Sequence, residues 1–208
     1  MSAPIRFRNL AAGGTALVPL LRGVVATDTL VLGIASGGVP VAAEIARTLR
    51  LELDVIFRKA LLQGAGEAAG AVNVAGHRIL DRITATAPPV SAADHFVVEE
   101  LEKFDRHVFG CRGERAPARI DSRPVLLVDD GMRTGETMRV CLRAVRMLNP
   151  SGVVVAVPVA DPAALSTIDS ATEVVCVQAA VPFGHVGMFY ENFDVPDASR
   201  ISAIVGAG

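Results

Sequence analysis

One segment is more informative than any other in this chain: Val125-Leu-Leu-Val-Asp-Asp-Gly-Met-Arg-Thr-Gly-Glu-Thr137. Its four apolar residues are typical of a buried strand, and residues 136–148 have the three-to-four spacing of an amphipathic helix. Between them, two adjacent carboxylates precede a turn rich in glycine and threonine. Such a turn presents free N–H groups at the positive end of a helix dipole, where phosphate binds. The segment therefore predicts a phosphate site at the carboxyl end of a strand.

The same order of strand, turn and helix recurs along the chain. Apolar runs typical of strands covered on both faces lie at 29–34, 53–57, 125–128, 153–159 and 173–177. Helical spacing occurs at 39–49, 91–110, 136–148 and 162–168, and Ser91 is placed to cap the longest of these helices. This alternation predicts an α/β fold with a mainly parallel sheet. Residues 59–73, rich in glycine and alanine, do not fit and are interpreted as a mobile loop.

Composition excludes several classes of function. The 208 residues, 51% of them hydrophobic, are enough for one domain spanning residues 1–208. A formal net charge of −2 gives no broad cationic surface for nucleic acid, and the longest apolar stretches are interrupted or too short for a membrane span. Three cysteines without CxxC spacing indicate a reducing compartment, so we expect a cytoplasmic protein that binds neither nucleic acid nor membrane.

The residues around the predicted phosphate site limit the kinds of ligand that it could bind. No GxxxxGK[ST] motif occurs, so a triphosphate has no Walker loop to bind. Asp129 and Asp130 would repel a phosphate unless they faced sugar hydroxyls or a divalent cation. A sugar phosphate with magnesium therefore fits best. Two alternatives are a solvated acidic turn and a phosphoryl-accepting receiver, but a receiver needs a lysine after a later strand, where Ala160 and Asp161 stand.

Residues 125–137 resemble the signature of the type I phosphoribosyltransferases, which is four apolar residues, two acidic residues and a loop ending Thr-Gly-x-Thr. The resemblance extends to one uncharacterised branch of that family at Phe7-Arg8, 37–42, Arg58-Lys59, 70–72 and 186–193. It implies a central parallel sheet of about five strands flanked by helices, with a mobile loop and a small hood. It also implies phosphoribosyl pyrophosphate and a nitrogenous base as substrates, Mg²⁺ as cofactor, and a homodimer.

The resemblance assigns roles to residues of this chain. Asp129 and Asp130 would hold the ribose hydroxyls and the magnesium ion. The 5′-phosphate would be held by Gly131, Met132, Arg133, Thr134, Gly135, Glu136 and Thr137. The pyrophosphate loop would be Ala35, Ser36, Gly37 and Gly38, with Arg58 and Lys59 neutralising the departing pyrophosphate. This agrees with the chemistry, because displacement at the anomeric carbon requires stabilisation of the negative charge on the leaving group.

Three departures from the branch leave two hypotheses open. Ser36 stands where the branch usually has arginine, and residues 60–69 keep little of its loop pattern. Arg133 stands where the branch usually has alanine, and where relatives specific for 6-oxopurines have aspartate, so 6-oxopurines are poor candidate substrates. One hypothesis is a phosphoribosyltransferase. The other is a non-catalytic protein that senses phosphoribosyl pyrophosphate or a nucleotide.

Two further clusters have alternative interpretations. The aromatic residues Phe183, Phe189, Tyr190 and Phe193 could stack on a base, but we favour a place at the edge of the core. Four arginines lie among proline and glycine and are interpreted as part of a solvated loop: Arg112, Arg115, Arg119 and Arg123.

Overall fold

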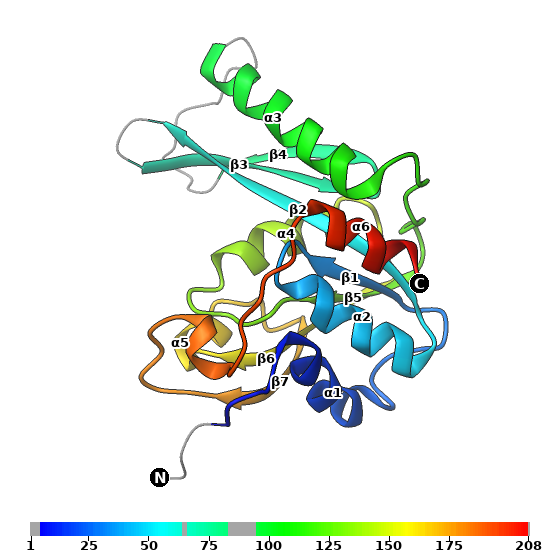
Figure 1. Cartoon of the computed structure of the whole chain (residues 1–208), viewed down its shortest axis with the longest axis vertical. Coiled ribbons are helices and arrows are strands. Elements are labelled where there is room, and N and C mark those ends of the chain that lie inside the picture. Colours follow the sequence, from blue (N-terminus) through cyan, green and yellow to red (C-terminus); the bar gives the residue numbers. More distant parts are fainter. Residues whose placement is uncertain (1–4, 64–65, 83–94, 208) are drawn as a thin grey trace.

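A seven-stranded sheet forms the centre of the structure, a computed structural model that describes residues 5–63, 66–82 and 95–207 (Figure 1). The strand order across the sheet is β4-β3-β2-β1-β5-β6-β7. Strands β2, β1, β5, β6 and β7 run parallel, whereas β3 and β4 are antiparallel additions at one edge. This confirms the α/β fold with a mainly parallel sheet. The bounds of the strands are β1 (Leu30–Ile34), β2 (Glu52–Gln63), β3 (Gly66–Val74), β4 (His77–Arg82), β5 (Pro124–Val128), β6 (Gly152–Ala160) and β7 (Glu173–Ala179).

Helices cover both faces of the sheet, because successive strand residues point to opposite sides. Leu127 of β5 packs into the core that contains residues of α4, whereas Leu126 packs into the core that contains residues of α1 and α2. Within the described residues, no helix has the length and apolar character needed to cross a membrane. The bounds of the helices are α1 (Leu10–Leu21), α2 (Gly38–Leu49), α3 (His95–Arg112), α4 (Glu136–Arg146), α5 (Pro162–Leu165), the 3-10 turn η1 (Val186–Phe189) and α6 (Ala198–Gly206).

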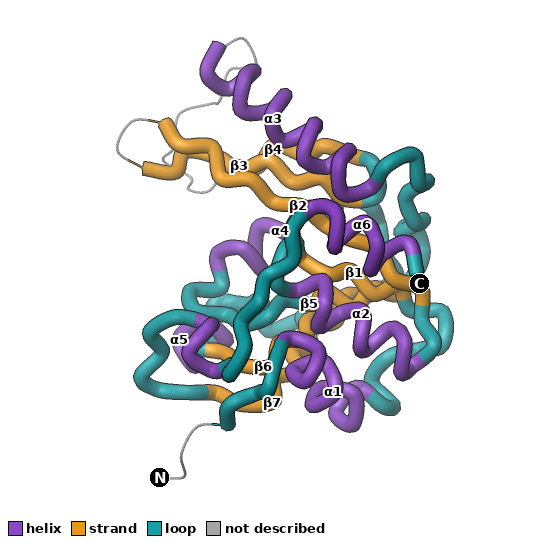
Figure 2. Tube along the Cα trace, viewed as in Figure 1, coloured by secondary structure: helices purple, strands orange, loops and turns teal. Residues whose placement is uncertain are grey.

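Strand β2 belongs to two parts of the molecule. Residues 52–56 pair with β1, and residues 57–63 continue beyond it to pair with β3. Figure 2 shows β2, β3 and β4 extending away from the parallel strands, with α3 lying over them. A third core fastens this extension to the rest of the fold and contains Phe57, Phe104 of α3 and Ile201 of α6.

The prediction of a mobile loop at 59–73 is wrong for the described residues, which lie in β2 and β3. These residues are rich in glycine and alanine and lack the continuous apolar run that identified the other strands, so the sequence pattern missed them. Strand β3 lies between β2 and β4 in the sheet.

The arginine cluster is mostly not a solvated loop. Arg112 donates a hydrogen bond of 2.6 Å to Oδ1 of Asp54, and their side chains are only 7% and 2% exposed. The amide of Ala118 donates to Oδ2 of the same carboxylate at 2.9 Å. Arg115 donates to the carbonyl of Leu53 at 3.2 Å. The segment between α3 and β5 has no helix or strand of its own. These hydrogen bonds to Leu53 and Asp54 fix it, and the end of α3, to β2.

The remaining helix predictions differ in their bounds. Residues 39–49 and 136–148 correspond to α2 and α4, but the predicted helix at 162–168 contains only the four residues of α5. The predicted cap, Ser91, lies outside the described residues.

Candidate functional site

The two carboxylates of the predicted phosphate segment lie at the carboxyl edge of the sheet. Asp129 and Asp130 follow β5, next to the carboxyl end of β1. The connections after these neighbouring strands lead to opposite sides of the sheet, to β2 and to β6, which is the usual position of a ligand site in an open α/β sheet. A cavity of about 270 Å³ opens here and is lined by residues 129–138 and Val186.

The loop after the carboxylates is anchored at one point and open at the others. The amide of Met132 donates to the carbonyl of Val159 at 2.9 Å, and the Met132 carbonyl accepts from Asp161 at 2.8 Å. Among the described residues, no hydrogen-bond partner is present for the N–H groups of Arg133, Thr134, Gly135 and Thr137. Because the loop leads into the N-terminus of α4, these free donors form a cup suited to an anion.

Gly135 is required by the geometry of this cup. It has a φ of 74°, in the left-handed region that favours glycine. A Cβ at this position would also collide with Oγ1 of Thr167 and lie 3.1 Å from the carbonyl of Ala164. The motif glycine is therefore explained by local packing as well as by backbone conformation.

The glycines of the predicted pyrophosphate loop lie against the two carboxylates. A Cβ on Gly37 would overlap the carboxylate of Asp130. One on Gly38 would lie 2.6 Å from the carbonyl oxygen of Val128 and 3.1 Å from Oδ1 of Asp129. The peptide bond between Ala35 and Ser36 is cis. Two loops that are far apart in sequence thus form one continuous surface.

Two adjacent buried carboxylates are electrostatically costly without a counter-charge. Burial raises the pKa of Asp129 well above its usual range, and the neighbouring charge of Asp130 raises it further. Burial also raises the pKa of Asp130, to about 6. The amide of Asp130 donates to Oδ1 of Asp129 at 2.9 Å, which offsets part of this cost. Vicinal hydroxyls or a divalent cation would stabilise the ionised pair.

Tyr190 is a site residue whose role the sequence analysis missed. Its hydroxyl donates a hydrogen bond of 2.6 Å to the carbonyl of Asp130, and the residue is only 2% exposed. The ring packs against Phe7 and Phe193, with centroid distances of 5.5 and 5.4 Å. For Tyr190 and Phe189, which are both buried, the favoured placement in the core is confirmed. Tyr190 therefore supports the backbone beneath the carboxylates.

The other predicted site residues line a second cavity, of about 290 Å³. Ala35, Ser36, Arg58 and Lys59 contribute to its wall, together with Phe57 and three residues of α3, which are Lys103, Phe104 and His107. Ala35 and Ser36 thus belong to the wall of this second cavity, whereas Gly37 of the same loop lies against Asp130, which lines the first. The sequence gives no sign of a role for α3 here, because only the tertiary structure brings this helix near the loop at 35–38.

Comparison with known proteins is consistent with this arrangement. A family model described as the phosphoribosyl transferase domain matches residues 15–191. A Mycobacterium tuberculosis protein, present in strains CDC 1551 / Oshkosh and ATCC 25618 / H37Rv under names that propose a phosphoribosyl transferase, is 32% identical over 204 residues. The match covers 96% of this chain but 46% of that protein, so the chain spans about half the length of the curated relatives it matches.

Solved structures share the fold. The crystal structure of TT1426 from Thermus thermophilus is 29% identical, with a TM-score of 0.76 and coverage of 97% of this chain and 98% of that one. A hypothetical protein from Neisseria gonorrhoeae, solved with bound ppGpp, is 13% identical and has a TM-score of 0.53, with coverage of 100% and 99%. The second likeness concerns the fold alone. Together with the matched residues 15–191, these findings show that the chain belongs to the phosphoribosyl transferase domain family.

Proposed function

We propose that this chain is a phosphoribosyltransferase that moves a 5-phosphoribosyl group between phosphoribosyl pyrophosphate and a nitrogenous base. One observation carries the proposal. The open N–H cup at 131–137 and the carboxylates of Asp129 and Asp130 share a cavity, and the Gly37-Gly38 loop packs directly against those carboxylates. One molecule carrying a phosphate, vicinal hydroxyls and a diphosphate could therefore contact all three.

Each part has a separate task in this proposal. The amides and threonine hydroxyls of residues 131–137 bind the 5′-phosphate, as neutral donors at a helix N-terminus. Asp129 and Asp130 accept hydrogen bonds from the ribose hydroxyls, which fixes the sugar. The loop at 35–38 binds the pyrophosphate through its backbone, since the N–H groups of Ser36 and Gly37 have no partner among the described residues. Arg58 and Lys59 offset the charge that develops on the leaving group.

Magnesium fits the donor set at the carboxylates. The described residues contain no group of three or more side chains placed to hold a metal, but Mg²⁺ is often bound by one or two carboxylates together with substrate oxygens. Asp129 and Asp130 would hold the ion, whose positive charge would stabilise the diphosphate as it leaves. Burial of the Asp129 carboxyl and the neighbouring charge of Asp130, which both raise the pKa of Asp129, support a cation here.

A second function, sensing without catalysis, is favoured by a different observation. Ser36 supplies no positive charge at the pyrophosphate loop, and Lys59 is ion-paired with Glu100 at 3.0 Å. With less positive charge at the leaving group, the protein could bind phosphoribosyl pyrophosphate without activating it for displacement. The family resemblance further implies a homodimer and, because of Arg133, poor use of 6-oxopurines, and the cysteine pattern favours a cytoplasmic location.

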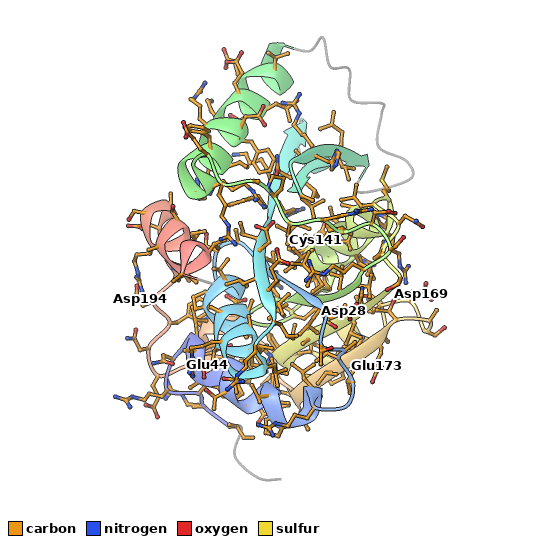
Figure 3. All side chains as sticks on the ribbon, turned by 90° about the vertical axis from the view of Figure 1, so that its right-hand side faces the viewer. Asp28, Glu44, Cys141, Asp169, Glu173 and Asp194 are labelled. Atoms are coloured by element: carbon orange, nitrogen blue, oxygen red, sulfur yellow. The ribbon has the colours of Figure 1, made fainter. Side chains whose placement is uncertain are left out.

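Calorimetric titration with Mg²⁺ and phosphoribosyl pyrophosphate tests the binding site. The double variant Asp129→Asn/Asp130→Asn should lose at least 100-fold in affinity. Asp28→Asn is the matched control, because Asp28 is exposed (Figure 3). It precedes β1 and so lies at the amino ends of the parallel strands, whereas Asp129 and Asp130 lie at their carboxyl ends. Equal affinity in the double variant and the wild type would refute the site.

Pyrophosphate release separates the two functions. The wild-type protein would be incubated with phosphoribosyl pyrophosphate and a panel of purines, pyrimidines and pyridines. Release with any base supports the enzyme. Binding without release for the whole panel supports the sensor.

A further inference from the structure

The chain has 20 basic residues other than histidine, and just two of them are lysines, Lys59 and Lys103. They are far apart in sequence, one on β2 and the other on α3, yet both line the cavity of about 290 Å³ described above. The remaining basic residues are arginines. We call this cavity the two-lysine pocket, defined by Ala35, Ser36, Phe57, Arg58, Lys59, Lys103, Phe104 and His107.

One carboxylate holds the two lysines together. Oε2 of Glu100 lies 3.0 Å from Nζ of Lys59, and Oε1 lies 2.8 Å from Nζ of Lys103. These contacts lower the pKa of Glu100, mainly through the hydrogen bond from Lys103. The Glu100 side chain is 17% exposed, whereas those of Lys59 and Lys103 are 40% and 57% exposed. Glu100 therefore positions two ammonium groups whose surfaces remain open to a ligand.

The charge and shape of the pocket favour a compact polyanion. Two ammonium groups share one carboxylate, so this trio has a net positive charge. A lysine ammonium acts on phosphate as a compact point charge, in contrast to the planar fork of arginine. The apolar rings of Phe57 and Phe104 form another part of the wall and are themselves buried, which lowers the local dielectric and strengthens attraction to an anion.

The position of the pocket indicates which anion. Its wall includes Ala35 and Ser36, whose loop continues through Gly37 to the carboxylate of Asp130. Ser36 has no charge, and the cations that share the pocket wall with it come from β2 and α3. The two-lysine pocket thus borders the same loop that would bind the leaving group.

We propose that Lys103 of α3 is a further binding residue for the pyrophosphate group, that it supplies the positive charge that Ser36 does not, and that Glu100 positions it beside Lys59. This inference rests on the proposed function and adds to it a role for α3. Lys103 is a binding residue for the leaving group, and Glu100 is a positioning residue.

Selective labelling of lysine with ¹³C and ¹⁵N allows a direct test, because the natural chain gives signals from two lysine side chains only. Titration with inorganic pyrophosphate in the presence of Mg²⁺ should shift both signals in a saturable manner. Lys103→Met should weaken pyrophosphate binding about tenfold, and Lys103→Arg should restore much of it. Arg106→Met is the control, because Arg106 is an exposed cation of α3 that is not part of the pocket wall.

Ribose 5-phosphate distinguishes failure of this inference from failure of the proposed function, because it probes the cup at 131–137. Binding of ribose 5-phosphate at equal affinity to the wild type and Lys103→Met, with the expected loss for pyrophosphate, supports both proposals. Unshifted lysine signals, or equal pyrophosphate affinity in Lys103→Met, would overturn the role of the pocket while ribose 5-phosphate binding upheld the cup. Absence of ribose 5-phosphate binding to the wild type would overturn the proposed function itself.

Discussion

Replacing Asp130 by asparagine should make the ligand-free protein more stable while it removes a binding group. Burial raises the pKa of this carboxyl from 3.8 to about 6, so ionisation of Asp130 opposes folding. Asparagine has nearly the same size and no charge, and the Gly37 backbone beside it leaves the necessary room. The substitution also removes the negative charge that raises the pKa of Asp129.

The size of this stabilisation follows from the pKa shift of Asp130. One pKa unit corresponds to about 1.4 kcal/mol, so a rise from 3.8 to about 6 corresponds to at most about 3 kcal/mol. The side chain keeps some contact with solvent, which reduces this value, and we expect Asp130→Asn to raise the free energy of unfolding by about 1–3 kcal/mol at pH 7.5. Binding groups often carry such a cost in stability.

The sign of the pH dependence provides a second check on the same prediction. Because the folded-state pKa lies above the unfolded one, the native state binds more protons between about pH 4 and pH 6. The free energy of unfolding of the wild type should therefore decrease as the pH rises through this range. In Asp130→Asn, which lacks this carboxyl, it should decrease less.

Urea denaturation at pH 4.5, 6 and 7.5, without Mg²⁺ or substrate, measures these differences. Asp28→Asn should behave like the wild type, since its exposed side chain has no hydrogen-bond partner within the described residues. If Asp130→Asn were no more stable than the wild type at pH 7.5, the account of the buried carboxylate pair would be wrong.

Three other substitutions test contacts around the site. Gly37→Ala should weaken binding of phosphoribosyl pyrophosphate at least tenfold in calorimetry, because its Cβ displaces Asp130; unchanged affinity would argue against the contact between the loops. Tyr190→Phe should lower the free energy of unfolding in urea by about 1–2 kcal/mol, because the Asp130 carbonyl loses its donor, and an unaltered midpoint would contradict this. Asp54→Ala should cost about 3–5 kcal/mol in the same assay, because Arg112 remains buried without its carboxylate and the Ala118 amide loses its acceptor, whereas a loss below about 1 kcal/mol would show that the pair is not structural.

Much of the parallel sheet was predictable because its strands are buried on both faces. Strands β1, β5, β6 and β7 begin and end within two residues of the predicted runs. The extension formed by the end of β2 with β3 and β4 was not predictable in this way, since residues 59–73 are rich in glycine and alanine and lack a continuous apolar run. Helix α1 was also missed, because it is apolar on all sides and contains Pro19.

The candidate site was predictable where its residues are neighbours in sequence. Residues 129–137 line one cavity, and the contact of Gly37 with Asp130 joins the second predicted loop to it. The hydrogen bond from Tyr190 and the approach of Lys103 could not be inferred, because both come from segments that only tertiary packing brings near. Arg112 was misinterpreted for the same reason, since its partner Asp54 lies 58 positions earlier.

A crystal structure of the protein soaked with Mg²⁺ and phosphoribosyl pyrophosphate would test the assignment of the 131–137 cup most directly. The account predicts the 5′-phosphate within about 3 Å of the amides of Thr134, Gly135 and Thr137, with the ribose hydroxyls facing Asp129 and Asp130. A 5′-phosphate bound elsewhere, with these amides left in contact with water, would contradict it.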